Sequence, residues 1–106
     1  MTYKLFLDDV RSPPDESWIV ARTYEEAIET VNAKGFPTTL SFDHDLGDDV
    51  HTGKDFANWL IERDLSENDM PEDFSYAVHS ANPPGAANIR GILDGYLKFK
   101  DIAERM

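Results

Sequence analysis

Two clusters of aspartates, each at the end of a short apolar run, constrain the fold of this chain more than any other feature. Asp8 and Asp9 follow one such run, and Asp43 and Asp45 follow another. Short apolar runs are typical of strands buried in a parallel sheet, and the carboxyl ends of parallel strands share one edge, where open α/β folds bind ligands. The sequence therefore predicts that the four carboxylates meet at that edge.

Strand and helix patterns alternate along the chain. Apolar runs predict strands at Tyr3–Leu7, Trp18–Ala21, Pro37–Phe42 and Phe74–Val78. Capping residues and helical spacing predict helices between Thr23 and Gly35, after Thr52 and after Gly85. The first helix has the pattern of a capping box, with Thr23 as N-cap and Glu26 three residues later. Strands joined by helices favour a parallel sheet.

The remaining segments have the composition of turns and loops. The acidic stretch Asp64–Asp73, which contains Pro71, is interpreted as a solvated polar loop. Pro83, Pro84 and Gly85 are expected to form a turn that precedes the last helix.

Composition limits the class of protein. With 106 residues, 41% of them hydrophobic, residues 1–106 suffice for one domain with a packed core. The net charge of −11 argues against an extended nucleic-acid footprint and suits a basic protein partner. The chain has no cysteine, which excludes disulfides and thiolate nucleophiles. No apolar run matches a signal core or a membrane span, so a cytoplasmic protein without membrane contact is expected.

The motifs around the aspartates resemble a known family. They are Leu7–Pro14, Ser41–Gly47, Thr52–Gly53 and Val78–Pro83. Together they are similar to the cyclic-phosphate processing receiver domain, a variant of the receiver fold of response regulators, over roughly residues 3 to 97. The resemblance implies a receiver-like (flavodoxin-like) three-layer α/β domain with a four-stranded parallel sheet in the order 2-1-3-4. It also implies a role in processing cyclic phosphates.

Two features depart from an ordinary receiver. The link between the first two strands is short and contains Pro13 and Pro14, so the usual first helix is expected to be absent. The link must then run extended, unless the second strand lies elsewhere. No fifth strand ends in the receiver's lysine, because Lys98 and Lys100 fall within the last predicted helix.

The crowded carboxylates predict a metal site. Asp8, Asp9 and Asp43 are the predicted ligands of Mg²⁺ or Mn²⁺, which prefer oxygen donors, with Asp45 contributing or accepting hydrogen bonds. The alternative is that these aspartates cap backbone N–H groups at strand ends.

Two histidines follow different strands and are expected at the same edge. His44 and His79 are predicted to transfer protons, with Asp45 as a third catalytic residue. The alternative is that each imidazole only orients a loop. His51, in the following loop, is interpreted as solvated.

Four further residues are predicted to bind phosphate. Arg11 has the bidentate geometry that phosphate favours, although a salt bridge to the acidic surface is the alternative. Ser80, Asn82 and Asn88 lie near the start of the last helix, where N–H groups attract anions, although turn chemistry also explains residues of this kind.

The leading hypothesis is metal-dependent hydrolysis of a cyclic phosphate, on a nucleotide or an RNA terminus. One alternative is a non-catalytic, degenerate receiver that binds a protein or a nucleotide. Another is phospho-acceptance at Asp45, eight residues before Gly53 as in receivers, or at Asp43, which is nearer the strand end.

Overall fold

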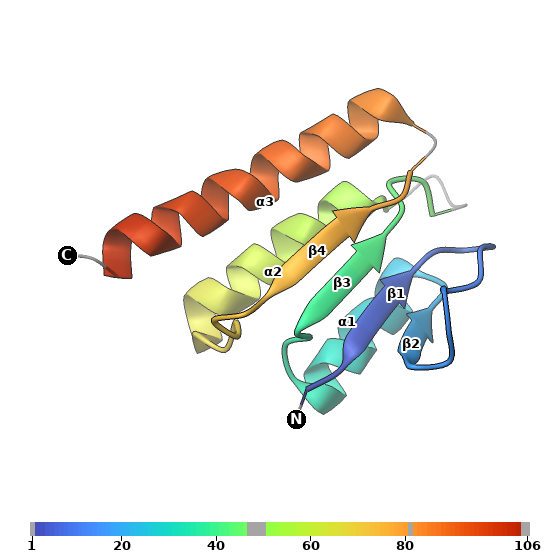
Figure 1. Ribbon diagram of the computed structural model, residues 1–106, viewed down its shortest axis with the longest axis horizontal. Coiled ribbons are helices and arrows are strands. Elements are labelled where there is room, and N and C mark those ends of the chain that lie inside the picture. The colour runs from blue at the N-terminus through green and yellow to red at the C-terminus, as the bar shows by residue number, and fades with distance from the viewer. Residues whose placement is uncertain (1, 47–50, 81, 105–106) are drawn as a thin grey trace.

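Four short strands form one parallel sheet in the computed structural model of this protein (Figure 1), which describes residues 2–46, 51–80 and 82–104. Gly47 and Ala81, which belong to the predicted motifs, lie outside the described residues. The strands are β1 (Lys4–Leu7), β2 (Trp18–Ala21), β3 (Thr39–Phe42) and β4 (Ser75–Val78). Their order is β2-β1-β3-β4, as predicted, and all neighbours are parallel.

The described residues form three helices in the predicted order, and N-cap residues explain where two of them begin. They are α1 (Tyr24–Lys34), α2 (Gly53–Glu67) and α3 (Pro83–Glu104). Thr23 caps α1 as expected, but the Glu26 carboxylate accepts from the N–H of Arg22 instead of completing a capping box. The reciprocal box occurs at α2, between Thr52 and Asp55.

Two predicted boundaries are wrong. The segment Asp64–Asp73 is not a solvated loop throughout, because α2 continues to Glu67 and Asp64 is only 3% exposed. Its carboxylate accepts hydrogen bonds from the side chains of Tyr96 and Lys100 in α3, both at 2.6 Å. Such distant partners cannot be seen in local polarity. The prolines of the predicted turn form the first turn of α3, where their missing N–H groups cost nothing.

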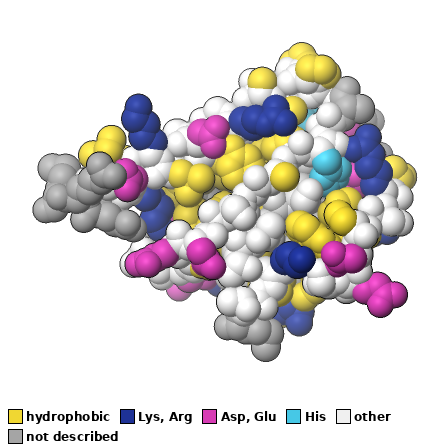
Figure 2. All heavy atoms as spheres, in the orientation of Figure 1, with side chains coloured by type: hydrophobic (Ala, Val, Ile, Leu, Met, Phe, Trp, Pro, Cys, Tyr) yellow, Lys and Arg dark blue, Asp and Glu magenta, His cyan; other side chains and the backbone are white. Residues whose placement is uncertain are grey.

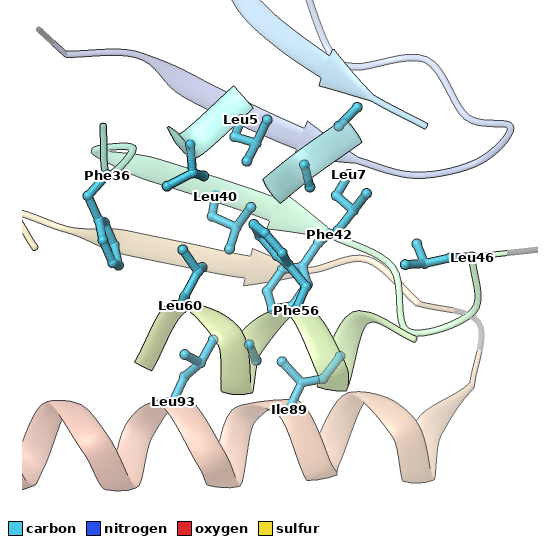
Figure 3. Close-up of a cluster of buried hydrophobic side chains, with 14 of the residues drawn as sticks. Leu5, Leu7, Phe36, Leu40, Phe42, Leu46, Phe56, Leu60, Ile89 and Leu93 are labelled. Carbon is cyan, nitrogen blue, oxygen red and sulfur yellow. The ribbon is translucent and has the colours of Figure 1, made fainter. Parts of the chain in front are cut away.

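The hydrophobic core lies on one face of the sheet (Figure 3). Leu5 and Leu7 of β1 and their partners Leu40 and Phe42 of β3 are fully buried there. Helices α1, α2 and α3 contribute further members of the same cluster, namely Ala27, Val31, Phe56, Ala57, Leu60, Ile89 and Leu93. All three described helices therefore pack on one side of the sheet.

The opposite face has no helix over it among the described residues. The expected fold class is correct, but these residues form two layers, not three. The reason is the β1–β2 link, residues 8–17, which returns to start a parallel strand without forming a helix. Parallel sheets are normally covered on both faces. Figure 2 views this open face, where histidine atoms lie toward the end at which the strands finish.

Candidate functional site

Three carboxylates converge where β1 and β3 end. Single oxygens of Asp8, Asp9 and Asp43 lie within 4.8 Å of one another. The ladder places Asp43 beside β1, because its N–H donates to the carbonyl of Leu7 at 3.0 Å. The fourth expected member, Asp45, is absent from this group; its side chain is 63% exposed and contacts His44 instead.

Asp8 is the most buried and most strongly held of the three. Its Oδ1 accepts from the backbone N–H groups of Val10 and Arg11, both at 2.9 Å, and its Oδ2 contacts Nε2 of His79 at 2.8 Å. Burial by itself raises the pKa of Asp8, but these backbone hydrogen bonds and the His79 ring outweigh burial and hold the pKa below its usual value. Asp8 is therefore an anion at neutral pH.

This donor set fits a hard divalent cation. A carboxylate offers about four acceptor positions, and the hydrogen bonds of Asp8 to the described part of the chain leave one of them, on Oδ2. Within the described residues, Asp43 accepts one long hydrogen bond, 3.4 Å from the N–H of Asp45. Anionic oxygens with no nitrogen or sulfur donor among them suit Mg²⁺ or Mn²⁺. Asp8 thus accepts hydrogen bonds from backbone N–H groups at the end of its strand, which is the alternative role given above. It also keeps an oxygen that can bind a metal.

His79 is held through both ring nitrogens. Nδ1 lies 2.8 Å from the hydroxyl of Ser41, and Nε2 lies 2.8 Å from the Asp8 carboxylate. The ring stacks on Phe6, with centroids 4.7 Å apart and planes 4° apart. The backbone carbonyl of His79 accepts from the guanidinium of Arg11. These contacts therefore fix the backbone of His79, the plane of its ring and the rotation of the ring within that plane.

His44 is held through one ring nitrogen. Its Nδ1 lies 3.0 Å from Oδ1 of Asp45, whose Oδ2 is 3.5 Å from the amide nitrogen of Asn82. Within the described residues, no hydrogen bond occupies Nε2 of His44. The imidazole packs against Gly85 in the first turn of α3, where a Cβ would lie 2.5 Å from its Cγ. His44 and α3 are therefore in direct contact.

The predicted phosphate-binding residues of α3 also have local roles. Asn82 caps the helix, because its Oδ1 accepts from the N–H of Gly85 at 3.1 Å. The Ser80 hydroxyl accepts from the N–H of Asn82 at 3.0 Å. Asn88 is exposed in the following turn of the helix. The turn chemistry given above as the alternative is thus present for Ser80 and Asn82.

Two arginines lie over the β1–β2 link. Arg11 is exposed, and its Nε lies 4.0 Å from Asp8 Oδ2, so the carboxylate contact given above as its alternative role is present. Arg22, which the sequence analysis missed, donates to the backbone carbonyls of Asp8 at 3.1 Å and of Arg11 at 2.5 Å. Its position directly after β2, at the same sheet edge, was the available signal.

Gly53 lets α2 approach the site. Its N–H donates to the carbonyl of His44 at 2.7 Å, and a Cβ at this position would overlap the backbone carbonyl of Asp43. No side chain fits without moving that loop.

His51, in contrast, belongs to a different surface: its ring stacks on Tyr24 with centroids 4.0 Å apart, so the interpretation that it is merely solvated is wrong.

Ser41 and Phe6 also escaped the sequence analysis. Phe6 pairs with Ser41 across the β1–β3 ladder, and Ser41 pairs with Ala77 of β4. Side chains two residues apart in a strand point to the same face, so Asp8 and His79 lie just beyond this row. A polar residue between the apolar Leu40 and Phe42 was the signal, but only the register shows its partner.

None of the described helices combines the length and apolar character needed to cross a membrane.

Comparisons with known proteins agree with this geometry at the level of the family. Comparisons with curated proteins and with solved structures gave no match. The model of the family described as "Cyclic-phosphate processing Receiver domain" matches residues 3–95, and the chain, with its parallel sheet and acidic edge, belongs to this family.

Proposed function

We propose that this protein is a metal-dependent phosphodiesterase that hydrolyses a cyclic phosphate on a nucleotide or at an RNA terminus. The observation that carries the proposal is the convergence of Asp8, Asp9 and Asp43 within 4.8 Å, with Asp8 and Asp43 buried. The family name supplies the substrate class. The hydrolysis and the metal are our inference from the chemistry of the side chains.

The three aspartates would hold Mg²⁺ or Mn²⁺. Such a cation neutralises charge on a phosphate and acidifies water. It would also overcome a general obstacle to binding, since a chain with a net charge of −11 repels an anionic substrate. Arg11, a predicted phosphate ligand, has its Nε 4.0 Å from Oδ2 of Asp8 in the cluster. Ser80, Asn82 and Asn88 remain predicted phosphate ligands at the start of α3.

His44 is the better placed of the two histidines for proton transfer. Its Nδ1 is oriented by Asp45, which leaves Nε2 to accept a proton from the attacking water. As the water oxygen bonds to phosphorus, the bond from phosphorus to the ring oxygen breaks, and the alkoxide takes a proton from solvent. His79 was also predicted to transfer protons, but the bonds to both of its ring nitrogens favour a positioning role.

The test is hydrolysis of 2′,3′- and 3′,5′-cyclic nucleotides followed by ³¹P NMR with Mg²⁺, Mn²⁺ or EDTA. We expect ring opening that EDTA abolishes and that Asp43→Asn reduces at least 100-fold, a loss typical of disrupted electrostatic stabilisation of a transition state. Asp73→Asn is the matched control, because Asp73 is an exposed residue remote in sequence from the cluster, and it should retain wild-type activity.

A second variant tests the proton-transfer role. His44→Ala should lose about 100-fold in rate, in the range of general acid–base catalysis, and added imidazole should restore part of it. Rescue should not occur in Asp43→Asn. If no metal supports turnover but nucleotides still bind, the protein is a non-catalytic binding module. Modification by acetyl phosphate that requires Asp43 or Asp45 would indicate a phospho-acceptor instead.

A further inference from the structure

A hydrogen-bonded chain of three side chains runs across the open face of the sheet. It leads from the hydroxyl of Ser41 through the imidazole of His79 to the carboxylate of Asp8, with both contacts at 2.8 Å. We infer that Ser41 is a positioning residue of the metal site, which acts through His79 to fix the carboxylate of Asp8. This inference rests on the proposed function for the presence of the metal.

The positions of the protons in these two hydrogen bonds follow from the chemistry of Asp8 and Ser41, the residues on either side of His79. Oδ1 of Asp8 accepts from two backbone N–H groups, so the carboxylate acts as an acceptor and Nε2 of His79 carries the hydrogen of their contact. In the neutral ring Nδ1 is then an acceptor, and the Ser41 hydroxyl donates to it. The carboxylate of Asp8 therefore sets the tautomer of His79, and the Ser41 hydroxyl stabilises that tautomer by donating to Nδ1.

Other contacts leave rotation of the ring as the freedom that Ser41 controls. Phe6 fixes the plane of the imidazole by stacking, and Arg11 holds the backbone of His79 through its carbonyl. Neither contact distinguishes Nδ1 from Nε2. Without the Ser41 hydroxyl, the ring can turn by half a rotation about its Cβ–Cγ bond, which moves Nε2 away from Asp8, and Asp8 then loses the donor that orients Oδ2.

The orientation of Oδ2 matters because Asp8 has little else to offer a cation. Both acceptor positions of its Oδ1 are taken by the backbone N–H groups of Val10 and Arg11. The one remaining position lies on Oδ2, beside the bond to His79. Groups that orient metal ligands typically change metal affinity by about 10–100-fold when removed. Ser41 is one hydrogen bond further from the metal, so the effect of its removal should lie at or below the lower limit of this range.

The decisive comparison is between Ser41→Thr and Ser41→Val. The two side chains have the same shape and both favour strands, but only threonine keeps the hydroxyl. We expect Ser41→Val and Ser41→Ala to weaken Mn²⁺ binding by about 3- to 10-fold and Ser41→Thr to stay within about twofold of wild type. The measurement is a Mn²⁺ isotherm by electron paramagnetic resonance. Ser75 lies in β4 on the same face of the sheet as Ser41, and Ser75→Ala, which removes its hydroxyl, should leave the Mn²⁺ affinity unchanged.

A second readout needs no metal. In ¹H–¹⁵N spectra of the metal-free protein, His79 should show the Nε2–H tautomer in wild type and Ser41→Thr, and a mixture of tautomers in Ser41→Val. Circular dichroism identifies any variant that fails to fold. Equal Mn²⁺ affinities and equal tautomer patterns in folded Ser41→Thr and Ser41→Val would overturn the inference, as would the absence of Mn²⁺ binding in wild type.

These results separate the inference from the proposed function. Mn²⁺ binding that depends on the Ser41 hydroxyl, without hydrolysis of any cyclic phosphate, would support the positioning role while the proposed function fails. Hydrolysis accompanied by equal Mn²⁺ affinities in the two variants would overturn the positioning role alone.

Discussion

The imidazole of His44 lies against Gly85, close enough that a methyl group at position 85 would fall 2.5 Å from the ring Cγ. This contact joins the end of β3 to the start of α3. It makes the position of a candidate catalytic side chain depend on a glycine that lies 41 residues further along the chain and has no functional group of its own.

Gly85→Ala should displace His44 without unfolding the protein. Alanine favours a helix by about 1 kcal/mol over glycine, and His44 is part-exposed and can turn outward. We expect hydrolysis to fall to the level of His44→Ala while the far-ultraviolet circular dichroism is unchanged. Gly91→Ala is the control in the same helix, since its Cβ meets no atom within 4 Å. Unchanged activity in Gly85→Ala would show that the packing of His44 against α3 is irrelevant.

Gly53→Ala should damage both stability and the metal site. Its Cβ would overlap the backbone carbonyl of Asp43, which cannot move aside as a flexible side chain can. Overpacking of this kind costs about 1–3 kcal/mol, measurable by urea denaturation, and Mn²⁺ binding should weaken with it. Gly95→Ala, where the added Cβ meets nothing, should not lose stability. Wild-type stability in Gly53→Ala would contradict the close approach of α2.

Mn²⁺ should stabilise the folded protein by mass action. At a free concentration 100 times Kd the gain is about 2.7 kcal/mol, or roughly 10 °C or more in Tm for a domain of this size. Asp9→Asn, which removes a carboxylate from the cluster, should abolish most of the shift. EDTA should return wild type to its original Tm. An equal shift in Asp9→Asn would exclude Asp9 as a ligand.

Asp64 should make stability depend on pH in the acid range. Burial alone raises its pKa, but the hydrogen bonds from Lys100, Tyr96 and the N–H of Met70 outweigh burial, so the pKa lies below its usual value. A carboxyl with a lowered pKa stabilises the fold above its unfolded pKa, about 3.9, and this contribution disappears as pH falls through the folded pKa. Wild type should therefore lose stability below about pH 4.

Asp64→Asn should remove that dependence and cost stability at neutral pH. We expect a loss of about 2 kcal/mol at pH 7, as for hydrogen bonds to a charged group, and a flatter acid limb in urea titrations. The exposed Asp73→Asn should leave both unchanged. Parallel pH profiles of wild type and Asp64→Asn would assign the acid sensitivity to other carboxylates.

Much of the fold was predictable because its signals are local. Strand positions and the helix caps at Thr23 and Thr52 follow from apolar runs and capping side chains, and the strand order follows from the resemblance to the receiver family. The convergence of Asp8 and Asp43 was predictable for the same reason, since both follow strands of one parallel sheet.

Local patterns therefore specify which elements form and which edge of the sheet collects acidic residues. Long-range packing accounts for the contact of Asp45 with His44, for the link from Ser41 through His79 to Asp8, and for the bonds from α3 to Asp64. The physical reason is that a hydrogen bond depends on positions to within a few tenths of an ångström. Such positions arise from strand register and helix packing between residues distant in sequence, which a local pattern does not encode.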